Sequence, residues 1–427
     1  MNTHRPQIDG LMPTLGCRRF ARRGIVLYLT TLCVALALTL VAVTTAATMV
    51  SQARANTLTS DTEQARVGAV SAMEFAIQAC NANPSWRTAH THAAPVIRTM
   101  NQVKLTYTIF DDADSLLAND DGQPVRIVSV GEFGASTQRA RLVARPRPLS
   151  CLESDVVAGG RVQVGTGNGL TVDVKASAND RVENTGTITG AVESSNTTSN
   201  SGVITGQIAN GVKSKEMPTA ATMNYYISRA SAINFASLPV SAGTKSLRNT
   251  LISPTENPYG TTNAQGIYII DCGGSNLMID SCRIVGTLIL VNPGSGSDIR
   301  NSVHWVAAVS NFPALMISGN MTINLTGATL NEADAGTNFN PASTPYQGVS
   351  DVDIAGVYPC LLQGIVYATG NLTLTGATRI DGVVVGAGNV PVTGLVAIKY
   401  LSLYANNPPP GFFSHRLGVA SGSWNDQ

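Results

Sequence analysis

Residues 184–206 read NTGTITGAVESSNTTSNSGVITG, in which the pattern Asn-x-Gly-x-Ile-Thr-Gly occurs twice with a period of 16 residues. Self-similarity at a fixed period of this size is typical of stacked structural repeats. Each copy places a short apolar stretch between Gly and Asn residues, which suit tight corners because they tolerate left-handed backbone angles. The segment therefore predicts one short β-strand per coil, with Ile188 and Ile204 facing inward.

Related repeats recur closer to the C-terminus. Residues 370–376 read GNLTLTG, residues 388–394 read GNVPVTG at a period of 18, and residues 319–323 carry the looser version GNMTI. Similar strand-like stretches lie between the repeats, at residues 266–270, 277–279, 287–291 and 314–317. The further residues expected to face inward are Leu372, Leu374, Val390 and Val392.

A right-handed parallel β-helix over residues 155–405, with inserted loops, accounts for these repeats because each coil buries its apolar side chains against the next. A β-sandwich is the alternative, although it does not require the near-constant spacing. The fold class is therefore mainly β. Within this region, residues 217–263 are less regular and begin with MPTAATMNYYISRASAI, which predicts one helix beside the coils. Residues 331–358 predict a long exposed loop rich in Pro, Asn and Asp.

Residues 84–150 predict a small α+β domain. Apolar and polar residues alternate over 103–109, over 125–130 and around 142–143, which indicates three antiparallel strands that cover a helix. The turn between the first two strands holds five aspartates, namely Asp111, Asp112, Asp114, Asp120 and Asp121. Clustered carboxylates suit Ca²⁺, but the spacing of a calcium-binding loop is missing, so we expect a solvated turn.

The overall composition excludes several classes of protein. Of the 427 residues, 44% are hydrophobic and 13% are charged, and the formal net charge is +1. A chain of this length and composition can build a sizeable core. Its charge gives no long-range field to attract nucleic acid, so no nucleic-acid partner is expected. The seven cysteines include no CxxC pair, which argues against zinc knuckles and thioredoxin-like redox chemistry.

An uncharged stretch of 30 residues, 24–53, is the strongest signal near the N-terminus. It is long enough to cross the membrane, and we expect the transmembrane helix at residues 24–50. Several arginines precede it in a basic cytoplasmic leader, residues 1–23, and the positive-inside bias then places the rest of the chain outside the cytoplasm. A cleaved secretory signal is the alternative, with a site at Ala53-Arg54-Ala55, although its apolar region would be about twice the usual length.

The helical pattern continues beyond the predicted span. Small and apolar residues recur at three- and four-residue steps between Ala65 and Ile77, and Pro84 closes the run. Residues 51–83 therefore predict an amphipathic helix, continuous with the span, that needs a packing partner outside the membrane.

The N-terminal segment RRGIVLYLTTLCVALALTLVAVTTAATMVSQARANTLTSDTEQARVGAVSAMEFAIQ resembles type IV pilin-like proteins, specifically PilX-type minor pilins and K-type minor pseudopilins. The repeats resemble the β-helical tails of some PilX-type proteins. The resemblance implies that a prepilin peptidase cuts after Gly24 and methylates Ile25, and that other pilin-like subunits are partners. Major pilins carry a glutamate at the fifth mature position, where this chain has Leu29. Its absence is similar to K-type tip subunits, and it equally fits an anchored protein that does not polymerise.

Parallel β-helices also occur in enzymes that cleave polysaccharides, which need paired carboxylates at a workable separation. The candidate side chains are Asp271, Asp280, Arg283, Asp298, Arg300, Asp351, Asp353 and Asp381. We expect them to face water at coil corners, and we expect His90 and His92 to lie in a solvated loop. No catalytic, cofactor-binding or metal site is predicted, and the chain is not expected to be an enzyme.

Four cysteines are candidates for disulfides. Cys80 ends the predicted helix and Cys151 ends the predicted sheet, so a bridge between them would staple the small domain in an oxidising compartment. Cys272 and Cys282 lie ten residues apart in the repeat region, where a disulfide and two buried thiols fit equally.

These features predict a structural protein of the inner membrane, in contact with lipid, that presents an exported β-helix for filament assembly or adhesion. The alternative is a membrane-anchored β-helix protein that binds or cleaves surface carbohydrate. Residues 406–427 are expected to form a C-terminal tail.

Overall fold

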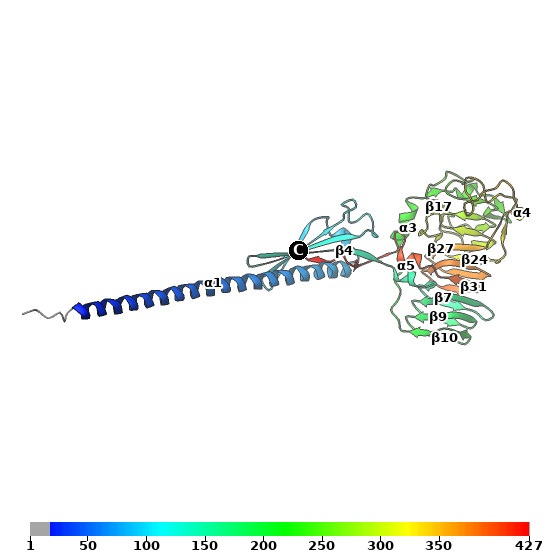
Figure 1. Ribbon diagram of the computed structural model, residues 1–427. Coiled ribbons are helices and arrows are strands. Elements are labelled where there is room, and N and C mark those ends of the chain that lie inside the picture. Colours follow the sequence, from blue (N-terminus) through cyan, green and yellow to red (C-terminus); the bar gives the residue numbers. More distant parts are fainter. Residues whose placement is uncertain (1–17, 427) are drawn as a thin grey trace, which may run out of the picture.

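The computed structural model describes residues 18–426, and it describes side chains for residues 24–425. It consists of a long N-terminal helix, a small sheet that packs on the second half of this helix, and a larger body of β-strands at the far end (Figure 1). The helices are α1 (Arg18–Ala82), α2 (Trp86–Ala89), α3 (Ala220–Ile227), α4 (Glu332–Ala335) and α5 (Leu403–Asn406), with 3₁₀ turns η1 (Ser150–Glu153) and η2 (Phe235–Ser237).

The helix α1 is continuous for 65 residues, which confirms the predicted continuity between the apolar span and the amphipathic segment. Residues 24–60 of α1 are exposed, whereas Ala65, Ala69, Met73 and Ala76 are buried against the small sheet. Alanine occupies three of these four positions because the sheet approaches the helix backbone closely. The helix ends at Ala82, just before the predicted stop at a proline.

The small sheet is antiparallel and runs in the order β1-β2-β3-β4-β32, with β33 also paired to β4. Its strands are β1 (Pro95–Met100), β2 (Val103–Phe110), β3 (Val125–Phe133), β4 (Ser136–Pro148), β32 (Phe413–Val419) and β33 (Asn425–Asp426). Alternate residues of β2, β3 and β4 are buried, so one face covers α1 as the alternation predicted. We call α1 from residue 61, α2 and this sheet the small domain.

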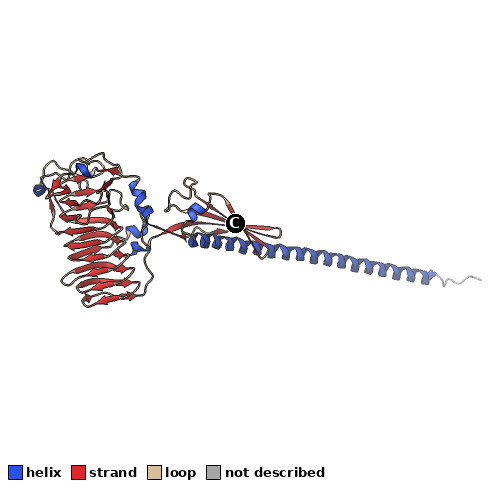
Figure 2. Cartoon of the chain, turned by 180° about the vertical axis from the view of Figure 1, so that it is seen from behind, coloured by secondary structure: helices blue, strands red, loops and turns tan. Residues whose placement is uncertain are grey.

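The last strand of the small sheet comes from the C-terminal end of the chain. Residues 406–427, expected as a tail, contain β32, which pairs antiparallel with β4. The chain leaves the sheet after β4 and returns to it at β32, so residues 149–412, which we call the β-body, are an insertion between two neighbouring strands. Figure 2 shows the two connections crossing between the small domain and the β-body.

The β-body contains two large sheets whose strands pair in parallel, apart from one antiparallel pair, β14 with β15. The ten-stranded sheet comprises β6 (Val162–Val164), β8 (Val182–Asn184), β10 (Thr198–Asn200), β14 (Val240–Ser241), β15 (Thr244–Arg248), β18 (Leu277–Asp280), β21 (Asp298–Asn301), β24 (Met321–Leu325), β28 (Leu372–Gly376) and β30 (Val390–Val392). This parallel pairing is compatible with the predicted β-helix and does not match the antiparallel sandwich alternative.

The second large sheet has fifteen strands. These are β5 (Val156–Ala158), β7 (Gly169–Ala178), β9 (Thr187–Ser194), β11 (Val203–Ile204), β12 (Ile208–Asn210), β13 (Ser231–Ala232), β16 (Leu251–Ile252), β17 (Ile267–Asp271), β19 (Arg283–Val285), β20 (Thr287–Val291), β22 (His304–Val306), β23 (Leu315–Ser318), β27 (Leu361–Ala368), β29 (Arg379–Gly386) and β31 (Leu395–Lys399). A two-stranded pair, β25 (Leu330–Asn331) with β26 (Val357–Tyr358), closes the long loop.

The strands of the β-body do not stack in the order of the sequence. Strands β5 to β12 are stacked in sequence from the middle of the body to one end. The chain then crosses to the opposite end, and the later strands are stacked from there back to the middle. The strand β30 then pairs with β6, β31 pairs with β7, and β29 pairs with β5. The two runs of strands therefore join in the middle of the body, and its lower end is formed by residues 198–210 (Figure 1).

The sequence repeats are neighbours in space, as predicted. Ile188 pairs in register with Ile204, and Leu374 with Val392. The residues expected inside are fully buried in one apolar cluster, except that Ile204 is only partly buried. The fully buried members are Ile188, Leu372, Leu374, Val390 and Val392.

The helix predicted at the start of residues 217–263 is α3, which lies against the β-body beside the connections to the small domain. Tyr226 of α3 is buried, and its hydroxyl donates a hydrogen bond to the Pro410 carbonyl at 3.1 Å. Thr222 donates to the Gly411 carbonyl at 2.6 Å. The helix thus fixes the returning connection to the body.

Candidate functional site

The first part of α1 has the character of a membrane span. Residues 24–60 are exposed, and the helix from Gly24 to Ala82 contains an apolar window with mean hydropathy 2.5, none of which is buried within the chain. Within the part of the chain that the structure describes, it is the one helix long and apolar enough to cross a membrane. An apolar surface of this size is costly in water and is compatible with a single-pass anchor, although a signal sequence has the same features.

The expected processing site lies inside this helix. A Cβ atom added at Gly24 would lie in open space, and Ile25 is exposed. Residues 1–17 of the basic leader lie outside the described residues, and residues 18–23 belong to α1. Leu29, which stands in place of a pilin glutamate, is also exposed on the apolar helix.

Beyond the apolar window, α1 and the first hairpin of the small sheet form a shallow groove. It is lined by Val67 and Gly68 of the helix and by Met100, Val103 and Leu105 of the strands, with Glu63 and Gln64 at its rim. The Val67 side chain is 61% exposed. The amphipathic half of α1 is therefore covered by the sheet on one face only, and an apolar strip remains open on another.

The carboxylates considered for catalysis are separated along the β-body, and most have local partners. Asp298 lies 2.6 Å from the Arg300 guanidinium, and Asp381 lies 3.1 Å from Arg379. Asp280 is buried, contrary to the expected water-facing corner, because it lies 3.2 Å from Arg248 and accepts from Asn301. Asp271 accepts from the backbone N–H of Gly273. Charges paired in this way along strand edges stabilise the coil surface modestly.

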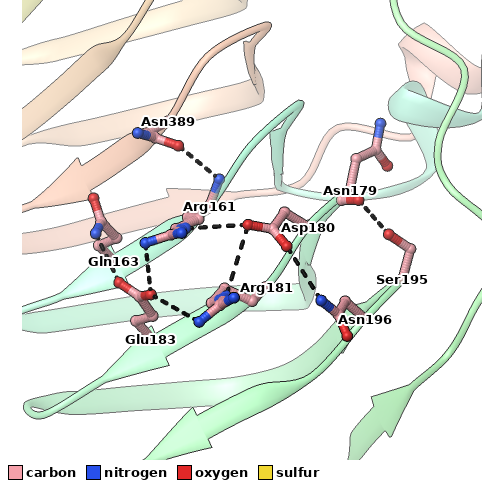
Figure 3. Close-up of polar contacts among 9 residues, drawn as sticks. All are labelled: Arg161, Gln163, Asn179, Asp180, Arg181, Glu183, Ser195, Asn196 and Asn389. Atoms are coloured by element: carbon pink, nitrogen blue, oxygen red, sulfur yellow. Dashed lines mark hydrogen bonds and ion pairs between the residues drawn. The ribbon is translucent and has the colours of Figure 1, made fainter.

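A further polar network lies where the two runs of strands join (Figure 3). Arg161 contacts the carboxylates of Asp180 at 3.1 Å and Glu183 at 3.0 Å, and Arg181 lies near both. The backbone N–H of Arg161 donates to Asn389 at 2.9 Å. This network links residues far apart in the sequence, and its balanced charges indicate a structural role.

The long loop 331–358 covers a buried polar cluster that the sequence did not indicate. Glu332 is fully buried and accepts hydrogen bonds from the backbone N–H of Phe339 at 2.5 Å, from that of Gly356 at 2.8 Å and from the Tyr358 hydroxyl at 2.8 Å. A lone glutamate in a polar loop has no sequence signal for such burial.

Arg283, predicted at a water-facing corner, is instead buried in the same cluster. Its guanidinium donates to the carbonyls of Phe339, Thr344 and Pro345 and lies over the rings of Tyr346 and Tyr358. Burial lowers the pKa of Arg283 and raises that of Tyr358. The expectation of a solvated corner was wrong for Arg283 because the loop folds over it.

Glu332, Asp351 and Asp353 form the one group of side chains in the described chain with the spacing to hold a metal ion. Asp353 is exposed, whereas Asp351 is half-buried and also accepts from the Asn340 side chain. Because Glu332 already accepts three hydrogen bonds, little of its coordination capacity is left, and we assign no ion to this group.

The remaining candidates have structural partners. His90 lies between the Trp86 carbonyl and the Tyr107 hydroxyl, and His92 accepts from the backbone N–H of Asp111. The loop with five aspartates forms the predicted turn, in which Asp112 pairs with Arg126 at 2.7 Å. Asp111 is buried rather than solvated, and it accepts from the backbone N–H of Ala113 at 2.9 Å. None of these histidines belongs to a metal-binding group within the described residues.

The four cysteines considered for disulfides are free thiols. Cys80 lies in the core of the small domain and Cys151 in a different cluster, inside the β-body, so the two do not form the expected bridge. Cys272 and Cys282 are buried in the main apolar cluster and are also unbridged. Burial raises the pKa of Cys80, Cys272 and Cys282 to about 12, which makes them poor nucleophiles.

Comparison with known protein families found no matching family model, and no curated protein matched in sequence. Among solved structures, a competence-associated pilin, ComZ, from Thermus thermophilus matches with 12% identity and a TM-score of 0.35, covering 86% of this chain and 98% of that one. An ice-binding protein from the Antarctic ascomycete Antarctomyces psychrotrophicus matches with 10% identity and a TM-score of 0.25, covering 58% of this chain and 95% of that one. An ice-binding domain from Shewanella frigidimarina matches with 12% identity and a TM-score of 0.22, covering 60% of this chain and 98% of that one. These likenesses do not establish a shared function.

Proposed function

We propose that this chain is a membrane-anchored surface subunit of the minor pilin or minor pseudopilin kind, which presents a β-helix outside the inner membrane for filament assembly or adhesion. The observation that supports it most is the insertion of the β-body between β4 and β32. Since these strands belong to the sheet that packs on α1, the helix, small domain and β-body are joined at two points, and the body lies farthest from the apolar end of the helix (Figure 1).

The open strip on α1 supports the assembly part of the proposal. An exposed apolar groove beside a helix favours contact with another apolar helix, because burying both surfaces removes them from water. The residues that form the strip, among them Val67 and Met100, lie beyond the predicted span, about 25 Å further along the helix axis for Val67, where another pilin-like subunit would pack. With Leu29 in place of a glutamate, the proposal places this subunit at the tip of an assembly rather than within its shaft.

A role in binding or cleaving surface carbohydrate is the second candidate. The group Glu332, Asp351 and Asp353 is the observation in its favour. We propose that the group is structural and that the chain is not an enzyme, since Glu332 is fully buried and its oxygens are already occupied by hydrogen bonds.

Mass spectrometry of the mature N-terminus tests the proposal. Cleavage after Gly24 with a methylated Ile25 is expected. A mature chain that begins near Asn56 would indicate a secretory signal, and one that begins at Met1 would indicate a plain anchor. Protease treatment of spheroplasts tests the orientation, since the β-body should be digested before the cells are lysed.

A further inference from the structure

The end of the β-body formed by residues 198–210, which we call the end coil, has strands that are paired on one side only. Its strands β10 and β11 are the terminal strands of the two large sheets, and β12 pairs only with β9. The chain then leaves along the side of the body, where the backbone N–H of Lys215 donates to Asn179. No described segment lies over the outer edge of the end coil, as Figures 1 and 2 show.

The side chains of the end coil repeat those of the coil beside it but lack a covering layer. Ile204 continues the row of Ile188, and Ile208 continues the row of Val192. Whereas Ile188 and Val192 are buried, Ile204 is only partly buried and Ile208 is 46% exposed. Val203 is 54% exposed and continues the row of Thr187, which is also exposed. A hydrogen bond of 2.8 Å from Asn184 to Asn200 joins the two coils, and this asparagine ladder stops at the edge.

The opposite end of the β-body is closed. There Leu238 is buried, and Phe235 and Tyr259 pack over the main apolar cluster. The Lys245 ammonium donates to the carbonyls of Ala236 and Leu238 at the same end. The two ends are therefore different, and stacking of the end coil onto the opposite end of a second molecule is blocked.

The end coil also lacks the features that protect a strand edge from association. Natural edges are usually protected by charged side chains, by proline or by a covering element. Residues 194–212 contain no charged residue and no proline. Because this edge carries no charge, two copies of it do not repel each other. The unpaired backbone N–H and C=O groups of one edge can form hydrogen bonds with those of the other.

We propose that the end coil is a docking surface for the same end coil of a second copy of this chain. The edge strands of the two copies pair antiparallel across a two-fold axis, and Val203, Ile204 and Ile208 of each copy are covered by those of the other. Because the contact uses the same surface on both molecules, it closes as a dimer and does not extend into a fibre. This joins two β-bodies at the ends distant from their loops, independently of any contact through α1.

Light scattering of the full chain in detergent micelles, at micromolar concentration, tests the proposal. It measures the mass of protein in each complex and hence the number of copies. The wild-type chain is expected to be a dimer, and Thr205→Lys, Val203→Lys and Ile208→Lys are each expected to weaken it by roughly tenfold or more, about 1.4 kcal/mol. Thr205→Lys introduces a charge at an exposed position without removing an apolar side chain. It also removes the hydrogen bond that the Thr205 hydroxyl oxygen accepts from the Gly190 backbone N–H at 3.1 Å. Thr205→Val removes the same bond without adding a charge, so it is the matched control and should stay dimeric.

Two control variants test whether the dimer contact lies at the end coil or at another surface. Val240→Lys, at a side chain 64% exposed near the closed end, should leave the dimer intact. Val67→Lys, in the groove beside α1, should also leave it intact, because that groove belongs to the proposed assembly contact. Hydrogen exchange at Ile204 should be slow in the dimer and fast in Thr205→Lys.

Four results would overturn the proposal. One is a wild-type chain that is monomeric under these conditions, and another is a dimer that survives all three end-coil substitutions. The third is a chain that is monomeric in detergent but whose end-coil backbone amides exchange slowly in native membranes. This result would mean that a strand of a different protein pairs with the edge. The fourth is loss of the dimer in Val67→Lys alone, which would assign the contact to α1.

Discussion

Gly131 of β3 and Ala65 of α1 approach so closely that a Cβ atom at Gly131 would lie 2.0 Å from the Ala65 carbonyl oxygen. A second contact, from the Ser129 hydroxyl to the Ala69 carbonyl at 2.7 Å, lies one helical turn away. The sheet therefore rests on the backbone of the helix, which explains why small residues recur on this face of α1. This interface joins α1 to the sheet from which the β-body is inserted.

We expect Gly131→Ala to destabilise the small domain by about 1–3 kcal/mol, because the added methyl group meets backbone atoms that cannot rotate away. Gly418→Ala is a matched control in the same sheet, where the nearest atoms belong to the flexible Arg147 side chain. It should cost less than about 0.5 kcal/mol. Chemical denaturation measures both changes. Equal, small effects would show that the helix does not lie this close to the sheet.

Leu374→Asp should cost several kcal/mol, since Leu374 is fully buried in the main cluster and an aspartate there would be an unpaired buried charge. Asn371→Asp is the matched control at the neighbouring corner. Asn371 is exposed and its side-chain oxygen accepts from the backbone N–H of Asn389 at 2.8 Å, which a carboxylate can also do. Thermal melting of both variants tests this prediction. Similarly small shifts in the two melting temperatures would contradict the stacking of Leu374 inside the β-body.

The contrast between these two positions also shows what the sequence predicts well. Gly and Asn at the corners, with alternating apolar residues between them, identify each strand. The period of the repeat then identifies which strand is its neighbour. The pairing of Ile188 with Ile204 and of Leu374 with Val392 therefore follows from the spacing alone. The apolar length of α1 likewise follows from composition. These are local signals, repeated within about 20 residues.

Contacts between distant segments have no such signal. Nothing in the spacing indicates that Val390 lies beside Val162, or that β32 returns to β4. The buried positions of Arg283 and Glu332 were missed for the same reason, since charged residues are usually exposed and only the folded loop supplies their partners. The bridge between Cys80 and Cys151 was inferred from positions at element ends, whereas the structure places them in separate cores.

The free thiols give a direct chemical prediction. In denaturant without reductant, Cys80, Cys151, Cys272 and Cys282 should all react with an alkylating reagent, because no disulfide protects them. In the folded protein the same four should react slowly, since they are buried and their pKa values are raised by burial. Peptide mass spectrometry with and without denaturant measures this. Alkylation of any pair only after reduction would show a disulfide there.

The last prediction concerns pH and His304, a buried residue on β22 whose Nδ1 lies 3.0 Å from the Pro359 carbonyl oxygen. Burial lowers the pKa of His304, and the nearby Arg283 charge lowers it further. In the unfolded chain the imidazole titrates near its ordinary value of about 6.5. The folded state therefore binds fewer protons than the unfolded state below that pH.

The contribution of neutral His304 to stability should be fully present above pH of about 6.5 and should fall as the pH drops toward the lowered pKa of the folded state. The loss is at most about 1.4 kcal/mol for each pH unit in this range. His304→Asn is the informative variant, because its side-chain amide can still donate to Pro359 but does not titrate. We expect the free energy of unfolding of the wild type to decrease more steeply than that of His304→Asn as the pH falls from 7 to 5. Identical slopes would mean that His304 is protonated equally in both states, and hence that the loop 331–358 does not keep it from water.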